Sequence, residues 1–181
     1  MTKNQGSTDV KTRTLAAAAL ALLLSACATS APAPERRAVA KKVDPAAVVA
    51  DVRATGEHGH ELEVQPLRDP QVEDLRLQAQ SLEAAGKLKP AGAALDQALA
   101  ITPEDPDLLQ WKAELALLRR AWQEAEVLAN QSFERGPKLG GLCRRNWATI
   151  AHAREHRGAS DAAAVARRQV ASCTVAPPVR M

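Results

Sequence analysis

The chain has 181 residues, which is enough for one small domain with appendages. Tyrosine is absent and phenylalanine occurs once, so a core must be built from Ala, Leu, Val and the three tryptophans. This composition suits closely packed helices and does not suit a β-sandwich. The formal net charge of +3 falls to +1 if residues 1–26 are removed, which argues against a nucleic-acid partner.

The amino terminus has the layout of a secretory signal peptide. Lys11 and Arg13 precede an apolar run over residues 15–24. This run is too short to span a bilayer, since spanning needs about 20 apolar residues. The closing tetrapeptide is Leu24, Ser25, Ala26 and Cys27.

That tetrapeptide resembles the lipobox of bacterial lipoproteins. The resemblance implies cleavage after residue 26 and acylation of Cys27, which would become the new amino terminus. Three acyl chains would hold a small domain firmly on a membrane, whereas one chain binds only marginally. Ala28 follows the cysteine, and by analogy with enteric bacteria this favours the periplasmic face of the outer membrane. The alternative is an ordinary cleaved signal in which Cys27 is incidental.

The next two segments separate the anchor from the main domain. Residues 27–43 contain prolines, alanines and charges without an apolar period, and we expect a flexible tether. Residues 44–70 are a poorly defined connection. Asp44 and Pro45 favour a helix start, and Val48, Val49 and Val52 would form its apolar stripe. Residues 61–67 alternate as an extended piece does, and would either lie along the first repeat helix or stay loose.

Residues 72–137 repeat at a period of 34 residues. Small residues and prolines coincide, so that Ala91 aligns with Ala125 and Pro103 with Pro137. This spacing predicts pairs of antiparallel helices that approach closely at small residues and end at a proline. The helices are expected near residues 71–85, 89–101, 106–119, 122–135, 142–156 and 160–172.

Signature positions recur in three units. The first has Leu75, Ala79, Gly86, Ala91, Ala98 and Pro103, the second Leu109, Ala113, Ala125, Ser132 and Pro137, and the third Trp147, Ile150, Ala151, Gly158 and Ala163. This pattern resembles the tetratricopeptide repeat, although Arg120 replaces the turn glycine of the second unit. The resemblance implies an all-α, right-handed solenoid of about three helical hairpins over residues 71–173, with a disordered tail at 174–181. An unrelated helical bundle rich in Ala and Leu is the alternative.

In that family, the first helix of each pair lines a concave groove. The residues expected to point into it are Glu73, Arg76, Gln80 and Glu83, then Asp107, Gln110, Glu114 and Leu117, and then Arg145, Thr149, His152 and His156. The charge runs from acidic to basic along this groove, which would suit an extended peptide of mixed charge. The six arginines of the third unit are interpreted either as a solvated surface or as a docking patch.

Histidine chemistry is the main alternative to a binding role. His152 and His156 lie four residues apart on one helix face and, with Glu155 or with His58 and His60, would make a small metal-binding protein or hydrolase. The zincin spacing is absent, as are a phosphate loop and a serine elbow. We therefore expect no enzyme, no cofactor and no metal.

Two cysteines remain in the mature chain. Cys143 opens the first helix of the third unit and Cys173 closes the second helix. Because those ends lie side by side in an antiparallel hairpin, and because a lipoprotein of this kind folds in an oxidising periplasm, we expect a disulfide between them. The sequence thus favours a lipid-anchored, non-catalytic scaffold or adaptor for proteins of the cell envelope, in assembly, secretion, pilus or cell-wall machinery.

Overall fold

The computed structural model of the chain describes residues 43–59 and 67–174. The predicted signal peptide, the lipobox with Cys27, nearly all of the tether, His60 and most of the extended piece lie outside these residues. So does all but the first residue of the predicted tail.

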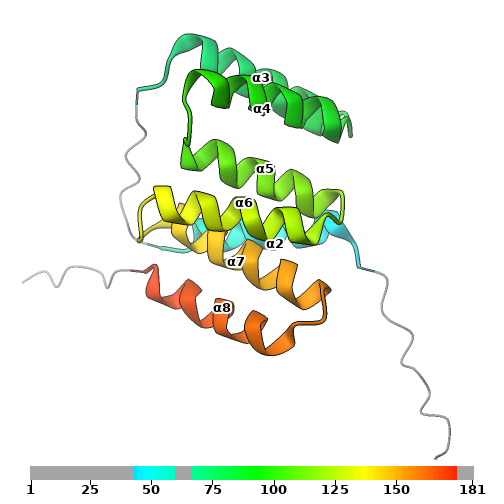
Figure 1. The fold of residues 1–181 in the computed structure, drawn as a ribbon, viewed down its shortest axis with the longest axis vertical. Helices are drawn as coiled ribbons and strands as arrows, with labels where there is room; N and C mark the ends of the chain where they lie inside the picture. Colours follow the sequence, from blue (N-terminus) through cyan, green and yellow to red (C-terminus); the bar gives the residue numbers. More distant parts are fainter. Residues whose placement is uncertain (1–42, 60–66, 175–181) are drawn as a thin grey trace, which may run out of the picture. The chain divides into compact units, whose positions relative to one another are not determined.

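The described residues form helices and contain no strand (Figure 1). In chain order the helices are α2 (Pro45–Glu57), α3 (Pro70–Ala84), α4 (Leu88–Ile101), α5 (Pro106–Leu118), α6 (Trp122–Arg135), α7 (Gly141–His156) and α8 (Ser160–Ser172). The prediction of an all-α repeat fold is confirmed.

Three helices begin at the same dipeptide, an aspartate followed by a proline. Asp44, Asp69 and Asp105 are the N-caps of α2, α3 and α5, and each side chain accepts a hydrogen bond from the backbone N–H two residues ahead, at 3.0, 2.8 and 2.8 Å. The proline takes the first helical position, where its missing N–H costs nothing. Short-range chemistry therefore defines these three starts.

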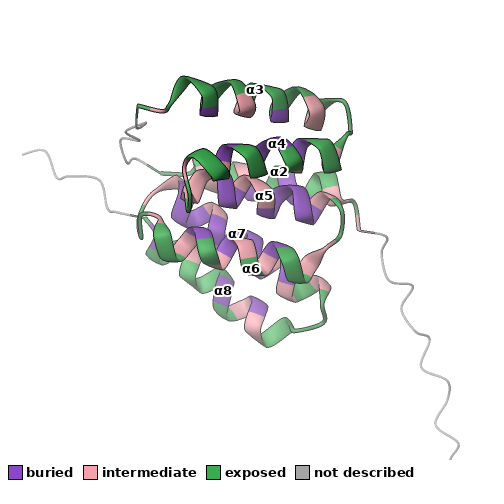
Figure 2. Cartoon of the chain, turned by 45° about the horizontal axis from the view of Figure 1, so that its top comes forward, coloured by how far each residue is buried: buried purple, intermediate pink, exposed green. Residues whose placement is uncertain are grey.

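Consecutive helices pack as the hairpins α3–α4, α5–α6 and α7–α8, and these stack through α4 on α5 and α6 on α7 (Figure 1). Small residues are buried where the helices meet (Figure 2). Ala79, Ala91 and Ala98 lie in one cluster with Leu95 and Leu108. Because an alanine lets two helices approach closely, the 34-residue period of small residues accounts for the hairpin packing.

The turn inside each hairpin has the same backbone conformation. Gly86, Arg120 and Gly158 have φ values of 70, 59 and 81°, in the left-handed region. In each turn the next residue donates its N–H to a carbonyl five residues earlier, at 2.8 to 2.9 Å. This is the bond that closes a helix in a Schellman motif. Arg120 therefore adopts the conformation that glycine adopts in the other two turns, at the steric cost of its Cβ.

Helix α2 precedes the first hairpin in the sequence but packs mainly on the other two hairpins. It packs against α7 and α5, the first helices of the third and second hairpins, and joins the same compact unit. Val48, Val49 and Val52 are buried in a cluster with Leu117 and Ala148. An apolar helix from the predicted connecting segment is thus part of the core.

The last hairpin is closed by a disulfide. Cys143 and Cys173 are joined with their Cα atoms 5.7 Å apart, and both side chains are buried. The bridge spans 30 residues, and closing a loop of that length stabilises the folded state by about 3.5 kcal/mol in the chain-entropy model.

Among the described residues, no helix combines the length and the apolar character that are needed to span a bilayer.

Substituting two glycines by alanine distinguishes the strain of a left-handed turn from the low helix propensity of glycine. A Cβ at Gly86 or at Gly92 would meet nothing within 4 Å, but Gly86 has a φ of 70° whereas Gly92 lies inside α4. We expect Gly86→Ala to lower the free energy of unfolding by about 1 kcal/mol and Gly92→Ala to raise it by about 0.5 to 1 kcal/mol. Urea denaturation measures both changes, and equal signs for the two variants would contradict the turn assignment.

Candidate functional site

The centre of the site is the carboxylate of Glu114, on α5, which is fully buried. Arg53 of α2 donates from Nε to Oε2 at 2.8 Å, and Arg145 of α7 donates from Nε to Oε1 at 2.9 Å. Gln110 adds a hydrogen bond from Nε2 at 3.1 Å. A buried carboxylate is tolerated only with such partners, so Glu114 ties α2 and α7 to α5.

Arg53 extends this network to the first hairpin. Its Nη2 donates to Glu83 Oε1 at 2.8 Å, and the indole of Trp111 donates to the other oxygen of Glu83 at 2.6 Å. Burial alone would lower the pKa of Arg53, but the charges and hydrogen bonds of Glu114 and Glu83 outweigh it and raise this pKa above its ordinary value. One guanidinium therefore bridges α3 and α5.

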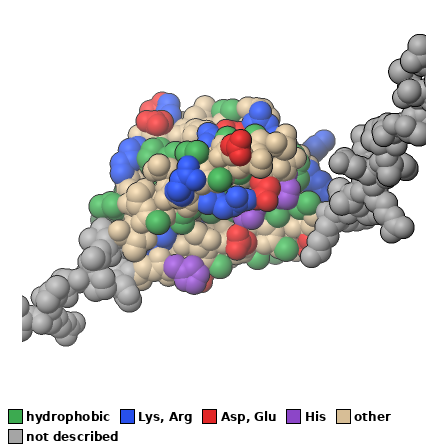
Figure 3. All heavy atoms as spheres, turned by 90° about the horizontal axis from the view of Figure 1, so that it is seen from below, with side chains coloured by type: hydrophobic (Ala, Val, Ile, Leu, Met, Phe, Trp, Pro, Cys, Tyr) green, Lys and Arg blue, Asp and Glu red, His purple; other side chains and the backbone are tan. Residues whose placement is uncertain are grey.

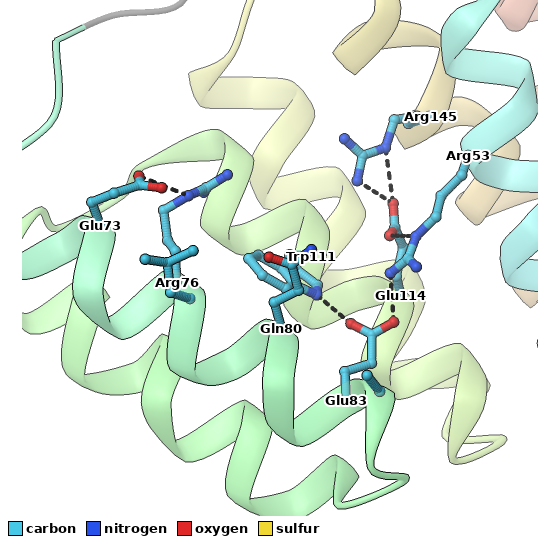
Figure 4. Close-up of a pocket in the computed structure, with 10 residues that line it drawn as sticks. Arg53, Glu73, Arg76, Gln80, Glu83, Trp111, Glu114 and Arg145 are labelled. Carbon is cyan, nitrogen blue, oxygen red and sulfur yellow. Dashed lines mark hydrogen bonds and ion pairs between the residues drawn. The ribbon is translucent and has the colours of Figure 1, made fainter.

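Beside this network the surface is hollowed over about 540 Å³ (Figure 4). The lining comes from α2, α3, α5 and α7: Arg53, Glu73, Arg76, Leu77, Gln80, Glu83, Ala84, Trp111, Glu114 and Arg145. From the sequence we expected six of these residues to face the groove: Glu73, Arg76, Gln80, Glu83, Glu114 and Arg145. Arg53 and Trp111 were not expected there. The packing of α2 across the hairpins leaves no local signal in the sequence, and Trp111 on α5 is not one of the positions that the repeat pattern assigned to the groove.

Arg76 is the lining cation with the weakest pairing. Its guanidinium lies 5.3 Å from the Trp111 ring centroid, in a cation–π contact. Its nearest carboxylate oxygen, on Glu73, is 3.6 Å from Nε, longer than a hydrogen bond. Burial lowers the pKa of Arg76 and the charge of Arg68 lowers it further, against the attraction of Asp107.

Some predicted groove residues do not face a groove. Gln110, Thr149 and Leu117 are fully buried, and Gln110 Nε2 donates to Thr149 Oγ1 at 2.8 Å. This differs from the sequence interpretation because α5 and α7 pack on each other at Gln110 and Thr149, and because Leu117 is buried in the cluster with the valines of α2. Asp107 forms an ion pair with Arg68.

The two histidines of α7 make contacts of a structural kind. His152 Nε2 is 2.7 Å from Asp51 Oδ2 of α2, and the His156 ring packs on Trp122 with centroids 4.6 Å apart. Burial, and then the charge of His152, lowers the pKa of His156. Within residues 43–59 and 67–174, no group of three or more His, Cys, Asp and Glu is arranged to hold a metal ion.

The basic third unit is largely neutralised by pairing. Arg154 and Arg157 both pair with Glu126, and Arg167 pairs with Glu155. Arg144 is buried and donates to the backbone carbonyl oxygens of Thr55 and Gly56, at the carboxyl end of α2. On the face displayed in Figure 3, basic and acidic side chains lie interspersed, which favours the solvated-surface interpretation.

The fold and the site define a helical-repeat domain whose first-helix face, formed by α3, α5 and α7, is partly covered by a helix of its own chain. The sequence matches no protein-family model and no curated protein. Among solved structures it is similar to the globular C-terminal domain of LpoP from P. aeruginosa. The match has 31% sequence identity and a TM-score of 0.54, and covers 58% of this chain and 99% of that chain. The similarity is therefore one of sequence as well as of fold.

The contribution of the buried Glu114 carboxylate to stability can be compared with that of an exposed carboxylate. Glu114→Gln removes the charge that two arginines share, and we expect the free energy of unfolding to fall by about 2 kcal/mol at neutral pH. Glu124→Gln is the matched control, because Glu124 pairs with Arg119 on the exposed surface, where such pairs contribute little. Chemical denaturation of both variants checks this, and equal losses would contradict the central role of Glu114.

Proposed function

We propose that this chain is a lipid-anchored interaction module at the periplasmic face of the outer membrane. It docks on an enzyme of cell-wall synthesis and does no chemistry itself. The similarity to the LpoP domain, at 31% identity over 99% of that domain, is the observation that carries the proposal.

The anchor follows from the amino-terminal sequence. Leu24, Ser25, Ala26 and Cys27 would direct cleavage and acylation, and Ala28 would favour the outer membrane. A disulfide between Cys143 and Cys173 is compatible with an oxidising periplasm. Acylated Cys27 would keep the folded domain near the membrane while residues 28–42 set its reach.

The binding role is supported by what the site offers. Arg53, Glu114 and Arg145 satisfy one another, so their charges are already used within the protein. What remains around the hollow is a set of side chains that can bind a ligand: Arg76, Leu77 and Gln80 on α3, with Trp111 on α5. Such a surface recognises a partner by shape and charge.

Site-specific photocrosslinking in cells that naturally make the protein tests this function. A photoreactive residue at Gln80, which is exposed and lines the hollow, is expected to capture an enzyme of cell-wall synthesis. The same residue at Gln131, which is exposed on α6 and does not line this hollow, is the matched control and is expected to capture that enzyme much less.

A second control uses the anchor. Cys27→Ser is expected to release the protein from the outer-membrane fraction and to lower the crosslinking yield from Gln80. The proposal is contradicted if neither position captures a specific envelope protein, or if the captured protein has no part in cell-wall synthesis.

A further inference from the structure

Helix α2 restricts which part of the first-helix face a partner can reach. It lies against α5 and α7, where Val49 and Val52 are buried. The hollow is lined at one end by the Arg53 network and extends from there along α3 (Figure 4). A ligand on the described part of this face therefore meets α3 and α5 first.

Arg76 has unused hydrogen-bonding capacity in that hollow. Its Nη1 atom is buried and has no hydrogen-bond partner among the described residues. The side chain as a whole is 20% exposed and lines the hollow. A buried guanidinium N–H without an acceptor costs free energy, and a carboxylate is the acceptor that matches its geometry best.

The other charges of the hollow do not fill this role. Glu83 and Glu114 are both held by Arg53, and Glu114 by Arg145 as well. Glu73 is the remaining carboxylate, but it is half exposed and 3.6 Å from Arg76. Glu73 thus competes weakly for Arg76 and does not satisfy it.

Apolar surface borders the same cation. Leu77 follows Arg76 on α3 and is 55% exposed, although it is a large aliphatic side chain. The Trp111 ring faces the guanidinium of Arg76 and lines the same hollow. A ligand that brings a carboxylate to Arg76 can therefore place an apolar neighbour on Leu77.

We propose that the hollow between α3 and α5 binds an acidic side chain of an extended segment of the partner protein, with Arg76 donating to its carboxylate and Leu77 contacting an adjacent apolar side chain. This inference rests on the proposed function and names the chemistry of the partner. The expected ligand is an internal Asp or Glu beside an apolar residue, because a single guanidinium, that of Arg76, is available to pair with one side-chain carboxylate.

Selection from a random heptapeptide library on the purified full-length protein tests the chemistry directly. The selected peptides are expected to be enriched in Asp or Glu next to an apolar residue. A fluorescent synthetic peptide of the enriched sequence then measures affinity, beside its twin in which the acidic residue is replaced by the amide.

Two substitutions in α3 are expected to act in opposite directions. Arg76→Gln should weaken binding of the acidic peptide about tenfold to a hundredfold, the range of a hydrogen bond to a charged group, and should leave binding of the amide twin nearly unchanged. Glu73→Gln should strengthen acidic binding, because it removes the competing carboxylate. Circular dichroism melting of each variant ensures that the fold is retained.

Four outcomes would overturn the inference. One is a selection without acidic enrichment, and another is acidic binding that Arg76→Gln leaves intact. The third is binding that appears only after Glu61 and Glu63 are changed to Gln, since the hollow would then be reserved for this chain's own segment. If the Arg76→Gln protein still captures the cell-wall enzyme by photocrosslinking from Gln80, the inference fails while the proposed function stands.

Discussion

The arrangement of helices around this site depends on one buried charge. Glu114 lies on α5 with no exposed surface, and its oxygens are satisfied by Arg53 from α2 and Arg145 from α7. These residues are 61 and 31 positions away in the sequence. Because removing either arginine would leave a poorly compensated buried carboxylate, the placement of α2 and that of α7 are energetically linked.

Helix α2 turns a repeat stack into a more restricted binding surface. An empty first-helix face would expose polar side chains of three hairpins, but here α2 lies against α5 and α7 and its arginine ends at Glu83 of α3. What stays open is the hollow around Arg76 and Trp111. A partner would therefore be recognised at the first and second hairpins, and α2 would form part of the wall that it meets.

Local and periodic signals in the sequence predicted the hairpins well. The repeated alanines predict where helices approach, and Pro103 and Pro137 predict where the second helices of the hairpins end. The position of α2 was not predictable in this way. Val48, Val49 and Val52 show that the helix has an apolar face, but nothing in their spacing says which surface receives it. Counting positions also placed Gln110 and Thr149 in an open groove, whereas direct packing of α5 on α7 buries both.

Hydrogen exchange of residues 45–57 is the most direct measurement of this arrangement. If α2 is an integral part of the core, the amides of its carboxyl-terminal half, beyond the first turn, exchange as slowly as those of α5 and α7 in the full-length protein. Exchange of these amides at the rate of an unstructured peptide, while α5 and α7 stay protected, would contradict the structure on which the restricted binding surface depends.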